Sequence, residues 1–142
     1  MSVAAILRGK PNRLIGLEDN RSLAEATQLL TRERIGALIV RNKAGEMIGI
    51  LSERDIVRAI AKDGAGVIDK PVSSVMTKDV VCVTPEDDIG EVMSLMTERR
   101  FRHLPVKRGD SLIGMVSIGD VVKKRVEEAE VEAQQLREYI AS

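Results

Sequence analysis

Two serine–aspartate pairs with the same spacing are the residues of this chain best suited to chemistry. Ser52 is followed three positions later by Asp55, and Ser117 is followed in the same way by Asp120. The simplest interpretation is a capping box, in which the serine caps a helix and the aspartate lies at the positive end of the helix dipole. The same groups also suit a nucleotide, because a helix start attracts phosphate and an aspartate can accept both hydroxyls of a ribose. The residues alone leave both interpretations open.

A glycine precedes each serine by three positions. Gly49 lies before Ser52, and Gly114 lies before Ser117. A glycine at the end of a strand removes a side chain and lets another group approach the backbone closely. The sequence therefore predicts a cleft beside each serine.

The two pairs belong to a repeat that covers most of the chain. Val40 and Val106 close matching apolar runs 66 residues apart, whereas Gly49 and Gly114 are 65 apart, so the two copies differ by one residue in a turn. In each copy the sequence pattern predicts a leading strand, a helix, two strands and a second helix. A copy of about 60 residues buries too little surface to be stable alone. We expect an α/β fold of two βαββα units packed sheet to sheet around a pseudo-two-fold axis, with a C-terminal helix.

Capping residues and apolar spacing place the elements of each copy. First helices are expected to open at Ser22 and Asp88, and second helices at Ser52 and Ser117. The expected strands are Arg13–Leu17, 37–40 and 47–51 in the first copy, and Asp79–Val83, 104–106 and 112–116 in the second. The predicted domains are residues 1–70 for the first repeat with an N-terminal segment, 71–125 for the second repeat, and 126–142 for the C-terminal helix.

Composition disfavours several classes of function. The 22 basic residues balance the 22 acidic residues, and the chain has one phenylalanine and one tyrosine, so nucleic-acid binding is not expected. Apolar runs are too short to span a membrane, and the single Cys82 suits a reducing compartment, so we expect a cytoplasmic protein. His103 is the sole histidine, which argues against a multi-histidine metal site or a catalytic triad. We predict no catalytic residue, no metal and no enzyme activity.

The motifs resemble those of tandem CBS domains, the regulatory modules named for cystathionine β-synthase. The resemblance rests on the doubled Gly-x-x-Ser-x-x-Asp, on Val-Ser-Ser-Val-Met-Thr at 72–77, and on Arg-His-Leu-Pro-Val at 102–106. It implies a regulatory module that binds AMP, ADP or ATP, and in some members NAD or S-adenosylmethionine, in one or both clefts between the copies. No catalytic cofactor is implied.

The resemblance also implies roles for individual residues. Asp55 and Asp120 would hold ribose hydroxyls, and Ser52 and Ser117 would support ribose or phosphate. The positions that meet phosphate in several members are matched by Arg54, Arg102 and His103.

The two copies differ at these positions, so two unequal sites are expected. Gly36 and Ala37 in the first copy replace Arg102 and His103 of the second. Gly119 stands where the first copy has Arg54, which leaves the second motif without its local cation.

The C-terminal residues carry a heptad stripe of apolar side chains. Its members follow a 4-3-4-3-4 spacing: Val122, Val126, Ala129, Ala133, Leu136 and Ile140. Such a helix either folds back on its own domain or contacts a second copy in a homodimer. The leading prediction is a signal-transduction module read by an unknown downstream protein. The alternative is a ligand-free protein-interaction or oligomerisation module.

Overall fold

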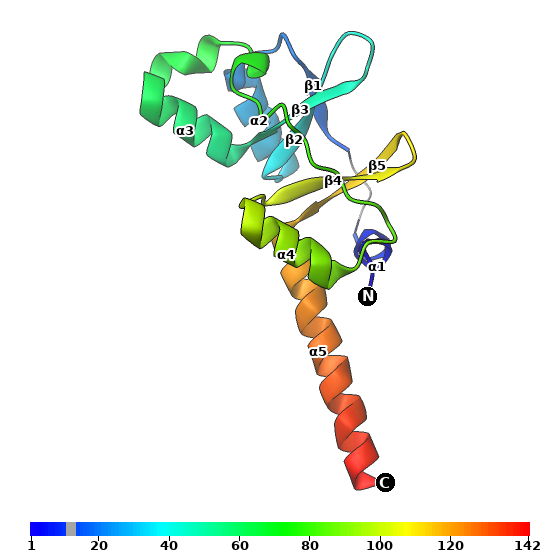
Figure 1. Ribbon diagram of the computed structural model, residues 1–142. Coiled ribbons are helices and arrows are strands. Elements are labelled where there is room, and N and C mark those ends of the chain that lie inside the picture. Colours follow the sequence, from blue (N-terminus) through cyan, green and yellow to red (C-terminus); the bar gives the residue numbers. More distant parts are fainter. Residues whose placement is uncertain (11–13) are drawn as a thin grey trace. The chain divides into compact units, whose positions relative to one another are not determined.

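The computed structural model describes residues 1–10 and 14–142, and its two compact units interleave along the sequence. Leu14–Val80 form the first-repeat unit. The N-terminal segment joins Val81–Ser142 in the second-repeat unit. Each unit combines helices with a small sheet, and a long helix ends the chain (Figure 1). The predicted α/β class with a C-terminal helix is confirmed.

The first-repeat unit contains a three-stranded sheet in the order β1-β2-β3. Strand β1 is parallel to β2, and β2 is antiparallel to β3. The predicted strand at Arg13–Leu17 begins among residues outside those described, and β1 is seen from Gly16. The elements are β1 (Gly16–Glu18), α2 (Leu23–Glu33), β2 (Ala37–Arg41), β3 (Met47–Ser52), α3 (Glu53–Asp63), and the 3-10 helices η1 (Ala65–Asp69) and η2 (Val72–Ser74).

The second-repeat unit contains a two-stranded antiparallel sheet, β4-β5. The helix α1 comes from the N-terminal segment, although the sequence assigned that segment to the first repeat. The elements are α1 (Val3–Arg8), α4 (Ile89–Arg99), β4 (His103–Arg108), β5 (Ser111–Ser117) and α5 (Ile118–Ala141).

The predicted leading strand of the second copy, Asp79–Val83, is wrong. Only Val83 pairs, in a single parallel bridge with Val106. In the first copy the N–H of Ile39 donates to the carbonyl of Ile15 at 3.0 Å. The matching residue of the second copy is Pro105, which has no N–H, so the equivalent bond cannot form.

Each unit has its own hydrophobic core. In the second-repeat unit, Val3 and Ile6 of α1 pack with buried side chains of α4, β4, β5 and α5, including Val92 and Val116. In the first-repeat unit, Val72 from the segment after α3 packs with side chains of α2 and the sheet. The compact units divide before Leu14 and after Val80.

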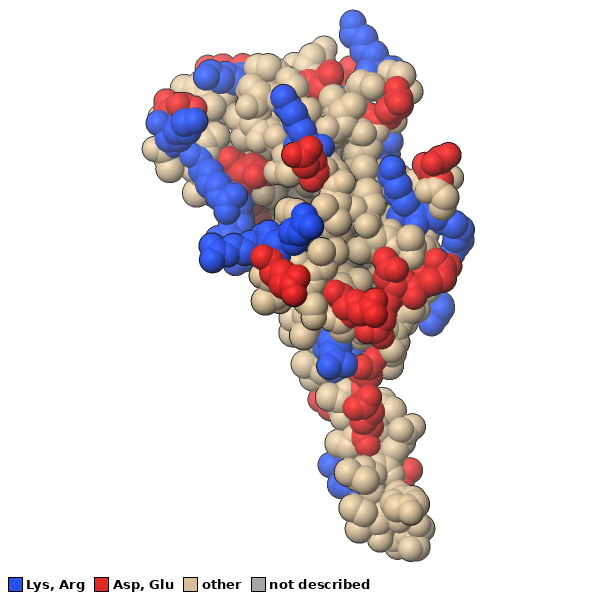
Figure 2. Space-filling view, viewed as in Figure 1, with Lys and Arg blue, Asp and Glu red and all other residues tan. Residues whose placement is uncertain are grey.

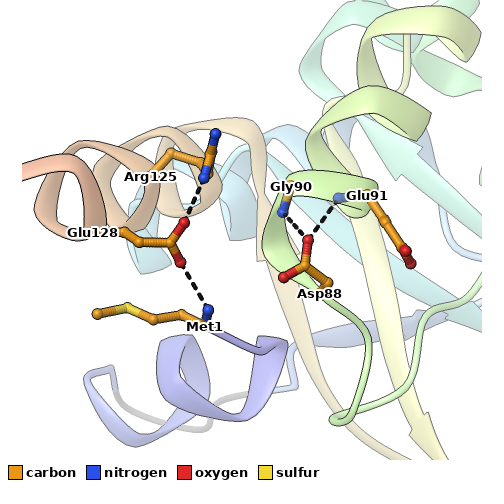
Figure 3. Close-up of polar contacts among 6 residues, drawn as sticks. All are labelled: Met1, Asp88, Gly90, Glu91, Arg125 and Glu128. Atoms are coloured by element: carbon orange, nitrogen blue, oxygen red, sulfur yellow. Dashed lines mark hydrogen bonds and ion pairs between the residues drawn. The ribbon is translucent and has the colours of Figure 1, made fainter. Parts of the chain in front are cut away.

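Both first helices begin at the predicted caps. The hydroxyl of Ser22 accepts the N–H of Glu25 at 3.1 Å. The carboxylate of Asp88 accepts the N–H groups of Gly90 and Glu91 at 3.0 and 3.2 Å (Figure 3). These bonds satisfy N–H groups that a helix start otherwise leaves without partners.

The long helix α5 continues without a break from the second helix of the second copy. Only its first turns pack into the core, where Val121 is fully buried. Farther along, Glu128 accepts a hydrogen bond from the amino group of Met1 at 2.7 Å and forms an ion pair with Arg125 (Figure 3). The side chains from Ala129 onward are exposed, so this part of α5 does not fold back on its own unit. None of the helices in the described residues is long and apolar enough to cross a membrane.

Candidate functional site

The first serine–aspartate pair forms a complete capping box at the start of α3. The Ser52 hydroxyl accepts the N–H of Asp55 at 3.2 Å, and Oδ2 of Asp55 accepts the N–H of Ser52 at 3.0 Å. Both residues are partly buried. The Oδ1 atom of Asp55 makes no hydrogen bond with the described residues, so the carboxylate keeps acceptor capacity beyond its capping role.

The second pair forms the same box at the start of α5. The Ser117 hydroxyl accepts the N–H of Asp120 at 3.1 Å, and Oδ2 of Asp120 accepts the N–H of Ser117 at 2.9 Å. One further contact distinguishes this pair from the first. The ammonium of Lys10 lies 2.8 Å from Oδ2 of Asp120 and also donates to the carbonyl of Met115 at 2.9 Å.

The environment of Asp120 favours its ionised form. Burial is the largest single influence on its pKa and acts to raise it, but the hydrogen bonds from Lys10 and Ser117 and the positive charge of Lys10 together outweigh burial and lower the pKa. At neutral pH the Asp120–Lys10 contact is therefore an ion pair between two partly exposed side chains.

This shift predicts a pH dependence of stability. Because the pKa of Asp120 is lower in the folded protein than in the unfolded chain, its contribution is present above the ordinary aspartate pKa and is lost as pH falls through the folded value. We expect the unfolding free energies of wild type and Asp120→Asn to differ at pH 6, and the difference to shrink as pH falls below the ordinary aspartate pKa of about 3.9. Urea unfolding across that range measures the difference, and a constant gap down to the lowest pH would contradict the assignment.

The space beside Gly49 is filled by a segment of the same unit, so the cleft predicted from this glycine is not open there. A Cβ built on Gly49 would lie 2.5 Å from Sδ of Met76 and 2.9 Å from the carbonyl oxygen of Thr77. The backbone of Ile50 exchanges hydrogen bonds with Thr77 at 3.0 and 2.8 Å. Beside Gly49, the missing side chain makes room for the segment after α3.

The basic residues singled out from the sequence lie near the two helix starts. The carbonyl of Arg102 accepts the N–H of Ile118 at 2.8 Å, which places the Arg102 backbone at the start of α5. His103 is paired with Ser117 across β4 and β5. Arg54 lies exposed in the first turn of α3. Gly36 and Ala37 take the matching places beside α3.

The structure thus gathers the predicted residues into two groups, one in each unit. The helix start of α3 carries Ser52, Arg54 and Asp55. Around the start of α5 lie Arg102, His103, Ser117 and Asp120.

Sequence reasoning missed Lys10. It lies 110 positions before Asp120, outside the repeat that revealed the other residues, and no spacing connects the two. The one signal in the sequence was the missing cation at Gly119, and Lys10 supplies a cation to the aspartate of that motif.

The described parts of the chain contain no group of three or more histidine, cysteine, aspartate or glutamate side chains that could hold a metal ion. Cys82 is partly buried, and burial raises the pKa of its thiol, so the reactive thiolate is disfavoured at neutral pH.

Comparison with known proteins gives the family. The CBS domain model matches residues 12–62 and 72–127. The CBS domain-containing protein CBSX3, mitochondrial, of Arabidopsis thaliana is 41% identical over 82% of this chain, which spans 58% of that protein.

Solved structures agree with this match. The CBS-domain protein ATU1752 of Agrobacterium tumefaciens superposes with a TM-score of 0.85 at 39% identity, covering 87% of this chain and 92% of that one. The CBS domain protein PAE2072 of Pyrobaculum aerophilum, solved with AMP, shares the fold with a TM-score of 0.73 at 23% identity, covering 84% and 89%. This chain therefore belongs to the CBS domain family and carries two copies of the domain in tandem.

Proposed function

We propose that this chain is a regulatory signal-transduction module that binds an adenine nucleotide, AMP, ADP, ATP or NAD, at the starts of α3 and α5. One observation carries the proposal: each repeat presents the same partly buried serine–aspartate box, in which Oδ1 of the aspartate makes no hydrogen bond with the described residues. Those oxygens can accept ribose hydroxyls, and the helix starts favour phosphate. The related protein PAE2072 was solved with AMP, which supports this ligand class.

Regulation in this proposal acts by ligand binding and not by catalysis. A nucleotide can change the shape or assembly of the module only if it binds two states with unequal affinity, and a downstream protein then responds to the difference. We place the protein in the cytoplasm, because its single partly buried cysteine suits a reducing compartment.

Binding measurements on the purified chain test the proposal. Calorimetric titration with AMP, ATP and NAD, together with a thermal-shift assay with S-adenosylmethionine, is expected to show binding of at least one adenosyl ligand. If none of these four ligands binds at millimolar concentration, the proposal is contradicted.

A second function, self-association, is favoured by the exposed face of α5. The apolar stripe is exposed along its length: Val122, Val126, Ala129, Ala133, Leu136 and Ile140. The far end of the helix presents mostly uncharged surface (Figure 2). An exposed heptad stripe of this kind is typical of a coiled-coil seam.

The charges beside the stripe favour a second copy of this chain in parallel orientation. With Val126 and Ala133 at the a positions, a parallel pair brings Arg125 opposite Glu130 of the second copy, and Glu132 opposite Arg137 of the second copy. In an antiparallel pair whose two stripes align over their full length, Glu130 and Glu132 would each lie opposite the same glutamate of the second copy. The pattern therefore supports a parallel homodimer.

Substitution in the stripe tests the homodimer. Leu136→Glu is expected to convert a dimer into a monomer in analytical ultracentrifugation, because it places like charges in the seam. Glu138→Leu, on another face of the same helix, is the control and should leave the dimer intact. A wild-type chain that sediments as a monomer at 100 μM would contradict the proposal.

A further inference from the structure

We propose that Lys10 sets the charge preference of the Asp120 site, which selects an adenosine derivative with an anionic substituent over a neutral or cationic one. This inference rests on the proposed function, since it concerns the ligand held at the start of α5. It assigns a specificity role to a residue that lies outside both repeats.

Two hydrogen bonds that the Lys10 ammonium donates fix its position. It donates to Oδ2 of Asp120 at 2.8 Å and to the carbonyl of Met115 at 2.9 Å. The helix α1 that precedes Lys10 is anchored by Val3 and Ile6 in the core of the same unit. Both the hydrogen bonds of its ammonium and the packing of the preceding helix α1 therefore hold Lys10 beside Asp120.

The Lys10–Asp120 contact leaves hydrogen-bonding capacity for a ligand on both side chains. Lys10 and Ser117 use only Oδ2 of Asp120, so Oδ1 keeps its two lone-pair sites for ligand hydroxyls. An ammonium has three donors, and the described residues accept two of them. The Lys10 side chain remains 34% exposed, so its third donor can meet an anion from solvent.

The charge balance at the two aspartates differs as a result. At α5 the negative charge of Asp120 is compensated by Lys10, and the helix start adds a positive partial charge. At α3 the carbonyl of Ile50, which matches that of Met115, accepts the backbone N–H of Thr77 at 2.8 Å instead of a cation. Among the described residues, Asp120 therefore has a direct ion pair with a cation, whereas Asp55 has none.

Removal of Lys10 would leave the Asp120 carboxylate uncompensated. That carboxylate would repel an anionic ligand and attract a cationic one, while a neutral ligand would be affected little. The sign of the change thus depends on ligand charge, which a merely structural role for Lys10 would not produce.

The test uses three adenosine derivatives of different charge, AMP, 5′-methylthioadenosine and S-adenosylmethionine, titrated calorimetrically. An Asp55→Asn background reduces binding at the first site. In that background Lys10→Met is expected to weaken AMP binding by roughly three- to tenfold, to strengthen S-adenosylmethionine binding by a similar factor, and to change 5′-methylthioadenosine binding by less than about twofold. Arg8→Met is the control, because Arg8 is exposed on the same segment and carries the same charge.

The outcomes separate this inference from the proposed function. Affinities that change in the same direction for all three ligands, or that Arg8→Met alters as much as Lys10→Met, would overturn the role of Lys10 alone. A wild-type chain that binds none of the three would overturn the proposed function together with this inference.

Discussion

Replacement of both Asp55 and Asp120 by alanine is expected to lower the affinity for AMP by about a hundredfold or more at each site. A hydrogen bond to a charged group contributes about 1.5–3 kcal/mol, and each carboxylate would lose two bonds to ribose hydroxyls. Calorimetry on the wild type and the double variant measures the loss.

The control for this prediction removes two carboxylates that lie outside both capping boxes. Glu53→Ala with Asp110→Ala takes away two exposed carboxylates, one of them in the first turn of α3, without touching either capping box. We expect this variant to bind AMP almost as well as wild type. The test variant keeps both serine caps but loses the carboxylate half of each capping box, which costs up to about 1 kcal/mol each, so circular dichroism must verify folding at the titration temperature. A lower melting temperature with unchanged affinity would show that the aspartates only cap their helices.

The substitution Gly49→Ala is expected to destabilise the protein by about 1–3 kcal/mol. The methyl group would overlap Sδ of Met76 and the backbone carbonyl of Thr77. The Thr77 backbone can move away only by breaking its two hydrogen bonds with Ile50. Urea unfolding measures the change in unfolding free energy.

Gly66→Ala is the matched control, because a Cβ at Gly66 would meet open space. We expect its unfolding free energy to stay within about 0.5 kcal/mol of wild type. An equal effect of both substitutions would contradict the close approach at Gly49.

The repeat made most of the fold predictable. Helix starts at Ser22, Ser52, Asp88 and Ser117 could be placed because a capping side chain and an apolar period coincide at each. The leading strand of the second copy was predicted from its own apolar run, and a single residue of the neighbouring strand made that prediction fail. Pro105 removes the N–H that Ile39 uses, a local effect that the apolar pattern does not reveal.

The contents of the two candidate sites were predictable only in part. Residues inside the repeat, such as Ser117 and Asp120, follow from its register. Lys10 does not, because its contact with Asp120 depends on α1 packing into the core of the second-repeat unit. The interleaving of the two units is a tertiary property, and local spacing in the sequence carries no signal for it.

The central claim is that the two capping boxes hold an adenine nucleotide, and amide chemical shifts of the 15N-labelled protein titrated with AMP test it most directly. We predict that the largest, saturable shifts occur at the N–H groups of residues 52–55 and 117–120. An AMP titration that leaves these amides unchanged, or that shifts only amides elsewhere such as the exposed part of α5, would contradict the claim.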